Sequence, residues 1–462
     1  MADPLWTSAD IARATGGAEG GGFSATGVSI DTRTLEPGDL FVALAGARDG
    51  HEFVAQAMAK GAAGALVSQE VDAPFVKAAD TLVALEKLGI AARDRATKAR
   101  RGAVTGSVGK TSVTQAIMAG LTLAGRAHSS VKSYNNHIGV PLTLARMAAD
   151  TERAVFEIGM NHADEIRPLT RFVRPQAVVV TTVGPVHTEN FADGEEGVAR
   201  AKAEVFEGLE PGGVAILNAD NRWFGLLKAE AEKAGGRVLS FGTGEACDAR
   251  LIDFQVPGSH AVVQARLHGK AMDFPILQTG FHWGLNSMAV LLMLEALDVD
   301  LDKSLAALGS FEPLAGRGAE SAVAVKGGAF TLIDESYNAN PISMASAIRT
   351  LGARATSGRR IVALTDMLEL GPEAEAFHAG LAAALEGASI DLVFCAGPLM
   401  KSLWDALPPT RRGGYAETAA ALAPQLAQAV EAGDVVMVKG SNGSKAGLIA
   451  QALLTVGSGE RG

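Results

Sequence analysis

The sequence has only two cysteines, few aromatic residues and no long hydrophobic run, and each scarcity excludes a class of protein. Cys247 and Cys395 lie far apart and form neither a metal-binding pattern nor a disulfide framework, which favours a reducing compartment. No stretch reaches the roughly 18 apolar residues of a membrane span. The N-terminus also lacks the basic start and apolar core of a signal peptide. We therefore expect a soluble, cytoplasmic protein.

An excess of positive charge is missing as well. The chain has 41 Lys and Arg against 51 Asp and Glu, which gives a net charge of −10. Nucleic-acid-binding proteins usually carry a broad basic surface, so we expect no nucleic-acid partner. An anionic ligand would have to be bound by local donors. The 48% hydrophobic and 20% charged residues are typical of a globular chain and not of a disordered one.

Short apolar runs alternate with helical patterns through the centre and the C-terminal part of the chain. Strands are expected at residues 102–105, 154–158, 177–182, 214–218, 330–334, 360–364, 392–396 and 434–438. Helices are expected between them, at 110–124, 197–209, 341–354, 374–386 and 417–431. Strands that alternate with helices indicate a mostly parallel sheet. The 54 glycines fit an α/β protein with many tight turns.

These patterns and a length of 462 residues predict an α/β protein with three domains. We expect a small mixed α/β domain over residues 1–82 and a central parallel-sheet domain with a phosphate loop over residues 83–313. A Rossmann-like α/β domain would follow over residues 314–462. Residues 82–101 are predicted to form a connecting helix whose basic end, from Arg93 to Arg101, is solvated.

The segment Thr105-Gly106-Ser107-Val108-Gly109-Lys110-Thr111-Ser112 follows an apolar strand and opens a helix, as a phosphate loop does. Its glycines allow backbone N–H groups to surround phosphate oxygens, and the helix N-terminus favours negative charge. Lys110 can reach the β- and γ-phosphates, and the Thr111 hydroxyl can bind Mg²⁺. Val104 stands where the usual pattern has its first glycine, so the loop is a shortened form. A chance Gly-Lys-Thr turn is the alternative.

Two polar residues follow expected strands of the same sheet. Glu157 ends the apolar run Ala154–Ile158, where a carboxylate is costly unless it is paired or bound to a metal. A buried salt bridge is the alternative. His187 follows the next strand after a Gly-Pro turn, which would project it from the carboxyl edge of the sheet. An ordinary polar loop residue is the alternative there.

Lys202 interrupts an apolar helical stripe formed with Val198, Phe206 and Leu209. One interpretation is that its stem is buried and its amine reaches water. The other is a desolvated amine near the nucleotide, which would lose its proton readily. Such an amine could be modified or act chemically.

Further motifs occur in each third of the chain. The N-terminal third has Ser29–Arg33, Gly38–Leu44 and Asp49–Phe53, and the centre has Tyr134–Pro141 and Glu157–His162. The C-terminal third has Asp334–Pro341 and Asp366–Gly371. With the phosphate loop, these motifs resemble the Mur ligases, the ATP-dependent amide-forming enzymes of peptidoglycan assembly, over nearly the whole chain. The two C-terminal motifs are similar to the branch that adds D-alanyl-D-alanine, and the Asp-Asn-Pro-Arg motif of the diaminopimelate- or lysine-adding branch is absent.

The resemblance implies a role for each matching residue. Lys110 would contact ATP phosphates, Thr111 and Glu157 would hold one Mg²⁺, and His187 would help to hold a second. Lys202 would be carbamoylated by CO₂ and become a metal-linked anion. The implied ATP contacts besides the phosphate loop are Asn286, Arg317 and Asp334. The implied substrate contacts are Ser29, Thr32, Arg33, His51, Asn135, Asn136, Asn161, Tyr337, Asn338 and Asn340.

The implied reaction joins UDP-N-acetylmuramoyl-tripeptide to D-alanyl-D-alanine through an acyl phosphate. We expect a monomer, although the sequence itself does not fix the oligomeric state. Two segments depart from the family pattern: Trp283 follows His282 where asparagine is frequent, and Ser441–Lys445 lacks the usual arginine. One alternative is a related ligase with another acceptor, either diaminopimelate or the glutamate of a folylpolyglutamate synthetase. A second is a phosphate-loop switch without ligase chemistry. The third residue of the donor tripeptide, diaminopimelate or lysine, stays open.

Overall fold

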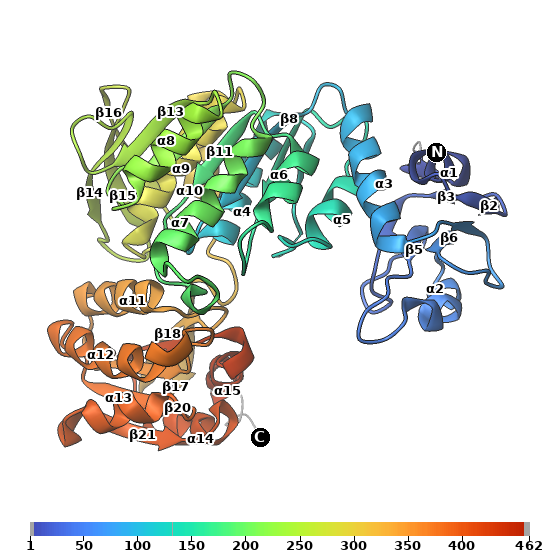
Figure 1. Cartoon of the computed structure of the whole chain (residues 1–462). Helices are drawn as coiled ribbons and strands as arrows, with labels where there is room; N and C mark the ends of the chain where they lie inside the picture. The colour runs from blue at the N-terminus through green and yellow to red at the C-terminus, as the bar shows by residue number, and fades with distance from the viewer. Residues whose placement is uncertain (1–3, 132, 457–462) are drawn as a thin grey trace.

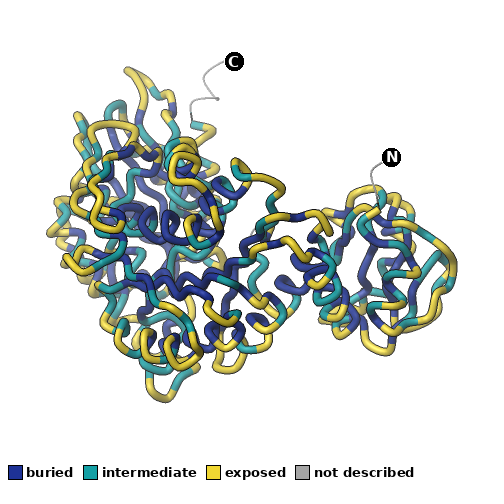
Figure 2. The backbone as a smooth tube through the Cα atoms, turned by 90° about the horizontal axis from the view of Figure 1, so that it is seen from above, coloured by how far each residue is buried: buried dark blue, intermediate teal, exposed yellow. Residues whose placement is uncertain are grey.

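A computed structural model describes residues 4–131 and 133–456 and arranges them as three α/β domains (Figure 1). The central domain adjoins both others, and the N- and C-terminal domains lie apart. Figure 2 shows that the N-terminal domain has a buried interior of its own. Within the described ranges, no helix is long and apolar enough to cross a membrane.

The N-terminal domain is a five-stranded sheet with strand order β2-β7-β6-β5-β4, in which only β2 is antiparallel to its neighbour. Its strands are β2 (Ala18–Gly20), β4 (Gly27–Ser29), β5 (Asp39–Val42), β6 (Gly64–Val67) and β7 (Phe75–Lys77). The short strands β1 (Trp6–Thr7) and β3 (Ser24–Ala25) pair separately. The helices are α1 (Ser8–Thr15) and α2 (Val54–Ala59), and α3 (Thr81–Arg95) leads to the central domain.

The central domain is a nine-stranded sheet with strand order β16-β15-β14-β13-β12-β11-β8-β10-β9. Its strands are β8 (Arg100–Thr105), β9 (Ala127–Ser129), β10 (Arg153–Glu157), β11 (Ala177–Val180), β12 (Val214–Asn218), β13 (Arg237–Gly242), β14 (Ala249–Gln255), β15 (Ala261–Leu267) and β16 (Lys270–Ile276). Strands β8 to β14 are parallel to one another, which confirms the mostly parallel sheet; β8, β10, β11 and β12 were predicted, whereas β9, β13 and β14 were not. Strands β15 and β16 form an antiparallel extension that the sequence analysis missed.

Two apolar cores lie on opposite faces of this sheet. One contains residues of α4 (Lys110–Ala124), α9 (His282–Ala296) and α10 (Leu301–Ser310). The other contains residues of α5 (Gly139–Ala145), α6 (Ile166–Val173), α7 (Glu195–Ala203) and α8 (Phe224–Lys233). Because both faces are covered, the strands are continuous apolar runs, which is why the sequence predicted them.

The C-terminal domain is a six-stranded sheet with strand order β17-β18-β22-β19-β20-β21, parallel except for β17. Its strands are β17 (Ala319–Val325), β18 (Gly328–Glu335), β19 (Arg360–Thr365), β20 (Leu392–Ala396), β21 (Arg412–Ala416) and β22 (Val435–Lys439). Its helices are α11 (Pro341–Ala353), α12 (Ala374–Gly387), α13 (Met400–Ala406), α14 (Ala419–Ala429) and α15 (Gly447–Thr455). The three-domain α/β fold is thereby confirmed, whereas the limits at residues 82 and 313 stay a prediction.

The predicted solvated connecting helix is wrong in two respects. The helix ends at Arg95, and Arg100 and Arg101 belong to β8. The Arg93 side chain is buried, and its Nη1 donates to the carbonyls of Arg171 (3.1 Å) and Phe172 (2.8 Å). The arginines are held because they bind backbone oxygens, which a charge pattern alone does not reveal.

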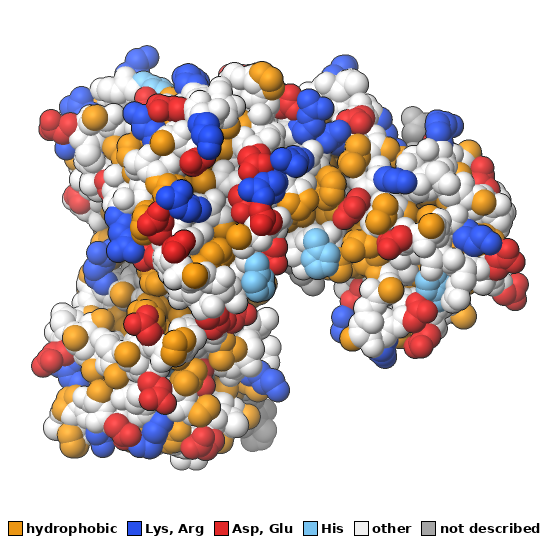
Figure 3. Space-filling model, in the orientation of Figure 1, with side chains coloured by type: hydrophobic (Ala, Val, Ile, Leu, Met, Phe, Trp, Pro, Cys, Tyr) orange, Lys and Arg blue, Asp and Glu red, His pale blue; other side chains and the backbone are white. Residues whose placement is uncertain are grey.

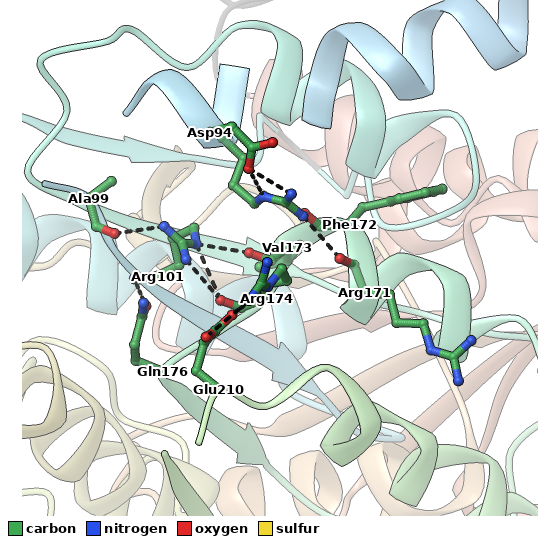
Figure 4. Close-up of polar contacts among 10 residues, drawn as sticks. Asp94, Ala99, Arg101, Arg171, Phe172, Val173, Arg174, Gln176 and Glu210 are labelled. Carbon is green, nitrogen blue, oxygen red and sulfur yellow. Dashed lines mark hydrogen bonds and ion pairs between the residues drawn. The ribbon is translucent and has the colours of Figure 1, made fainter. Parts of the chain in front are cut away.

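Arg101 completes this arrangement at the end of α6 (Figure 4). Its Nε donates to Val173 O at 2.9 Å, and its Nη1 donates to Ala99 O at 2.9 Å. Its backbone N–H donates to Gln176 Oε1 at 2.6 Å. The last carbonyls of a helix have no partner within the helix, and a cation there is favourable. Arg93 and Arg101 thus fix α6 to β8 and α3, away from the phosphate loop.

We expect Arg101→Ala to lower the free energy of unfolding by about 1–3 kcal/mol, because it leaves buried carbonyl oxygens without donors. Urea denaturation followed by circular dichroism measures the change. Arg13→Ala is the control, since the Arg13 side chain is 77% exposed and pairs with Asp10 on the same helix, α1. Equal losses in the two variants would contradict the anchoring role.

Candidate active site

A cavity of about 1130 Å³ lies between the central and C-terminal domains, and it is called the cleft below. Its central-domain wall contains the phosphate loop and the first turn of α9. Its C-terminal wall contains the loop from β18 to α11 and the end of β22. On the outside, the three domains leave a wide recess between the N- and C-terminal domains (Figure 3). The cleft therefore joins a nucleotide-type loop to residues more than 200 positions away.

The phosphate loop connects β8 to α4, as predicted. Gly106 and Gly109 have φ angles of +146° and +87°, which side chains rarely adopt. A Cβ atom at Gly106 would lie 2.0 Å from Thr181 Oγ1. No side chain caps the N-terminus of α4, so its N–H groups are available to an anion. The Lys110 amine donates to Gly106 O at 2.7 Å and so lies over the loop. This cradle fits the phosphates of a nucleotide.

Glu157 lies at the end of β10 and is only 1% exposed. Its Oε1 accepts a hydrogen bond from Asn135 Nδ2 at 2.6 Å, whereas its buried Oε2 has no hydrogen-bond partner. Neither oxygen forms an ion pair with a residue in the described ranges. The alternative interpretation, a buried salt bridge, is therefore wrong. A carboxylate oxygen without a partner, in a cleft with the Thr111 hydroxyl, fits an oxygen-binding cation such as Mg²⁺.

In residues 4–131 and 133–456, no three His, Cys, Asp or Glu side chains form a cage for a metal ion. At nucleotide sites Mg²⁺ usually has few protein ligands and is bound together with water and phosphate oxygens. Thr111 Oγ1 lies 3.2 Å from Ser133 Oγ and accepts from Arg317 Nη2 at 3.1 Å. The hydroxyl thus faces both domains.

His187 follows β11 in a left-handed conformation, with φ +60°. Its Nδ1 lies 2.9 Å from Glu369 Oε2 of the C-terminal domain. Burial, together with the positive charges of Lys110 and Lys202, lowers the pKa of His187 to about 4. The imidazole is therefore neutral near pH 7, the form that can bind a metal.

Lys202 lies on α7 and is only 2% exposed, so the interpretation that its amine reaches water is wrong. Burial lowers the pKa of Lys202 well below its ordinary value, and the nearby Lys110 lowers it further. No other described residue forms a hydrogen bond or ion pair with the Lys202 amine. A buried amine with no acceptor is unprotonated more readily than a surface lysine, and it is then a nucleophile.

Arg317 reaches the cleft from the segment between the two domains. Its guanidinium lies over the Tyr337 ring, 4.2 Å from the centroid. Asp334 does not line the cleft. Its carboxylate accepts the N–H groups of Gly316 (3.2 Å) and Ser336 (3.0 Å) and so shapes the turn that presents Arg317. The predicted direct contact of Asp334 with ATP stays a prediction.

The predicted substrate residues fall into three groups. Those that line the cleft, together with Asn286, are Asn135, Tyr337, Asn338 and Asn340. Two others serve local structure: Asn136 Oδ1 accepts from Gly139 N at 2.9 Å, and the Asn161 carbonyl accepts from Asn190 Nδ2 at 3.1 Å. The remaining four, in the N-terminal domain, are Ser29, Thr32, Arg33 and His51.

Ser29 ends β4, and the His51 Nε2 accepts the backbone N–H of Ser68, one residue after β6, at 2.9 Å. Both residues therefore lie at the carboxyl edge of a parallel sheet, where ligands usually bind. Thr32 donates to Gln56 Oε1, and Arg33 pairs with Asp31 at 2.6 Å. None of these residues lines the cleft.

Several cleft residues were not predicted as site residues. Lys439, at the end of β22, is buried and donates to Glu335 Oε2 (3.2 Å) and Asn338 O (3.0 Å). His282 lies at the start of α9, and burial lowers its pKa. His282 and Lys439 lie next to the two segments that depart from the family pattern, Trp283 and Ser441–Lys445. Those departures were the sequence feature that could have drawn attention to them. Glu369, which lies outside the cleft lining, was not predicted as a site residue either, and its Oε2 lies 2.9 Å from His187 Nδ1.

The two departures from the family pattern have structural accounts. Trp283 points into the core, where it is 3% exposed and packs on Phe311 with 5.7 Å between ring centroids. It does not line the cleft, unlike its neighbour His282. Ser441 Oγ accepts from Leu368 N at 3.1 Å and donates to Ala339 O at 3.3 Å, so this segment supports two loops near the cleft.

Three family descriptions match the chain: "Mur ligase family, catalytic domain" at residues 24–98, "Mur ligase middle domain" at 104–294, and "Mur ligase, glutamate ligase domain" at 322–442. The UDP-N-acetylmuramoyl-tripeptide–D-alanyl-D-alanine ligase of Escherichia coli is 35% identical over 82% of this chain and 83% of its own length. The cleft and these matches define a multidomain ligase. The chain belongs to the Mur ligase family.

Solved structures agree. The crystal structure of MurF from Acinetobacter baumannii has a TM-score of 0.85 and 26% identity, over 97% of this chain and 98% of that one. MurF from Thermotoga maritima, solved in complex with ADP, has a TM-score of 0.77 and 21% identity over 94% and 98% of the two chains, and it shares the fold.

We expect Gly106→Ala to weaken nucleotide binding by about tenfold or more, because a side chain there is strained and displaces Thr181. Titration calorimetry with ADP measures the affinity. Gly212→Ala is a matched control: Gly212 also has positive φ (+74°), but a Cβ atom there would meet nothing within 4 Å, and the residue lies outside the cleft. Unchanged ADP affinity in Gly106→Ala would contradict the assignment of this loop.

Proposed function

We propose that this chain joins D-alanyl-D-alanine to UDP-N-acetylmuramoyl-tripeptide at the expense of ATP, in the cytoplasm. The observation that carries the proposal is the cleft, where the phosphate loop and Glu157 face Arg317 and Tyr337 of the C-terminal part. The similarity to the Escherichia coli ligase over most of both chains supports this substrate pair. We expect a monomer, because a single chain supplies both walls of the cleft.

In the proposed reaction, the donor carboxylate attacks the γ-phosphate of ATP, which gives an acyl phosphate and releases ADP. Phosphoryl transfer depends mainly on alignment and charge neutralisation. Lys110, Arg317 and the N–H groups at the start of α4 would bind the phosphate oxygens. A Mg²⁺ ion held by Thr111 and Glu157 would supply further charge neutralisation.

In the second step, the amine of D-alanyl-D-alanine attacks the acyl carbonyl, a C–N bond forms, and inorganic phosphate leaves from a tetrahedral intermediate. Water would hydrolyse the acyl phosphate, so the reacting groups must be shielded. The contacts of Arg317 and Tyr337 with the central domain close one side of the cleft. Tyr337, Asn338 and Asn340 are the proposed acceptor contacts.

The Lys202 amine is the proposed site of carbamoylation. An unprotonated amine attacks CO₂, an N–C bond forms, one proton is released, and the neutral amine becomes an anion. Lys110 disfavours a protonated amine at this position but attracts the carbamate, which supports a modified lysine there. With His187, the carbamate would hold a second Mg²⁺.

The N-terminal domain would bind the UDP end of the donor through Ser29, Thr32, Arg33 and His51. The recess between the N- and C-terminal domains leaves room for an extended molecule between this sheet and the cleft (Figure 3). In this way a single donor spans two domains, and only its carboxyl end enters the cleft.

Acceptor choice is tested by ATP-dependent phosphate release with the diaminopimelate and the lysine forms of the donor tripeptide. We expect turnover with D-alanyl-D-alanine and none with free diaminopimelate. Turnover with diaminopimelate alone would show a different branch of the family. Phosphate release that needs no donor would favour a nucleotide switch.

Lys202→Ala is expected to lose nearly all activity in the same assay, because the variant lacks the proposed anion. Added bicarbonate should not restore it, whereas a short-chain carboxylic acid should restore part of it by occupying the vacated space. Lys228→Ala, on the exposed face of neighbouring α8, is the control. Full activity of Lys202→Ala would remove the second-metal proposal.

A further inference from the structure

We propose that Lys439 is a positioning residue for the acceptor, because its buried ammonium fixes the loop that carries the proposed acceptor contacts Tyr337, Asn338 and Asn340. The inference rests on the proposed function, since it takes these three residues to contact D-alanyl-D-alanine. It gives a role to a buried lysine of the cleft that the proposed reaction does not use.

The place of Lys439 in the sheet brings it to the start of this loop. Lys439 is the last residue of β22, and β22 lies between β18 and β19. In the parallel pairing of β18 with β22, Glu335 is the register partner of Lys439. Both strands therefore end at the same edge of the sheet, where the loop from β18 to α11 begins. Lys439 is only 2% exposed, so its ammonium depends on protein partners and not on bulk water.

The ammonium has two such partners among the described residues. Its Nζ donates to Glu335 Oε2 at 3.2 Å and to the Asn338 carbonyl at 3.0 Å. An ammonium has three N–H donors, so both bonds can form at once. The carboxylate of Glu335 compensates the buried charge, and the second bond holds a backbone group. One side chain of β22 thereby ties the start of the loop to its middle.

The two ends of the loop are fixed without Lys439. The Tyr337 N–H donates to the Gly316 carbonyl at 3.1 Å. At the other end, Asn340 caps α11, because its Oδ1 accepts the Ser343 N–H at 2.9 Å and its own N–H donates to Ser343 Oγ at 3.0 Å. These bonds would persist in a chain that lacked the lysine.

The middle of the loop depends on the end of β22. Within the described residues, the backbone of Asn338 has no hydrogen bond except the one from Lys439. The next carbonyl, that of Ala339, accepts from Ser441 Oγ at 3.3 Å, also just past β22. The Asn338 side chain is exposed and lines the cleft, so its position follows from the backbone that Lys439 holds.

A donor without a partner lies at the end of the same loop. Asn340 lines the cleft and is 2% exposed, and its buried Nδ2 has no hydrogen-bond partner in the described ranges. A buried polar group without a partner calls for one that the chain does not contain. The carbonyl and carboxylate oxygens of a dipeptide match this donor. The loop that Lys439 fixes therefore offers a hydrogen bond to an acceptor molecule.

The stability of the fold alone does not require a lysine at this position. Apolar residues that replace a buried ion pair often leave a protein as stable as before, or more stable. An apolar side chain cannot, however, bind the Asn338 carbonyl. The distinctive contribution of Lys439 is thus the position of the loop.

The test is steady-state phosphate release by the full chain at saturating ATP and donor, with D-alanyl-D-alanine varied. We expect Lys439→Met to raise the KM for D-alanyl-D-alanine by about 10- to 100-fold, because it removes a hydrogen bond from a charged donor. The effect on kcat at saturating acceptor should be much smaller. The affinity for ADP, measured by titration calorimetry, should not change, which also shows that the variant is folded.

Three further variants complete the test. Glu335→Gln combined with Lys439→Met leaves no unpaired carboxylate and should show the same raised KM. Lys439→Arg should restore part of the acceptor affinity, since a guanidinium can still donate to the carbonyl. Lys401→Met is the matched control: this lysine of α13 also pairs with a carboxylate, that of Asp405, but its side chain is 50% exposed. It should have the KM of the unaltered chain.

The outcomes separate this inference from the proposed function. If the double variant keeps the acceptor KM of the unaltered chain, the positioning role is overturned and the proposed function stands. If the affinity for ADP falls as much as the acceptor KM rises, Lys439 only supports the fold, and the positioning role is again overturned. If the unaltered chain does not respond to D-alanyl-D-alanine, the proposed function fails, and this inference fails with it.

Discussion

The burial of lysine amines without carboxylate partners is the constraint on which the rest of the site depends. Lys202 is 2% exposed and has no polar partner in the described ranges. Lys110, half-buried above the phosphate loop, adds a second positive charge nearby and has only Glu157 to offset it. Buried charge is costly unless it is paired. The site therefore favours anions that come from outside the fold: phosphates for Lys110 and, as proposed, a carbamate at Lys202.

This constraint explains how an acidic chain can serve highly anionic substrates. The net charge of −10 means that the protein as a whole does not attract anions. The cleft instead concentrates a few donors: the N–H groups at the start of α4, Lys110 and Arg317. Glu157, whose Oε2 has no hydrogen-bond partner, is the residue proposed to bind a cation beside the phosphates. Because a few donors in the cleft are placed to bind phosphates, the protein needs no overall positive charge to do so.

The site is built from two parts of the chain that are far apart in sequence. Arg317, Tyr337 and Glu369 contact side chains of the central domain. Arg317 and Glu369 carry opposite charges and contact different groups, the Thr111 hydroxyl and the His187 imidazole. These side chains therefore bring one cation and one carboxylate to two points of the contact between the domains.

Much of the fold and the centre of the site could be predicted from the sequence, because buried parallel strands are continuous apolar runs and a phosphate loop has a local motif. The expected helix 110–124 is α4 itself, and Glu157 and Lys202 were noticed because charged residues interrupt apolar patterns. Strands β15 and β16 were missed because they form a half-exposed antiparallel edge. The anchoring of Arg93 and Arg101 by carbonyl groups, and the contact of Glu369 with His187, involve residues about 70 to 180 positions apart, which no local pattern records.

The most direct test of this account is ¹³C nuclear magnetic resonance of the protein in ¹³C-labelled bicarbonate. The account predicts a carbamate carbon signal that is present in the unaltered chain and in Lys228→Ala, and absent in Lys202→Ala. A chain without a carbamate signal, or a signal that persists in Lys202→Ala, would contradict the claim that the buried amine becomes the anion of the site.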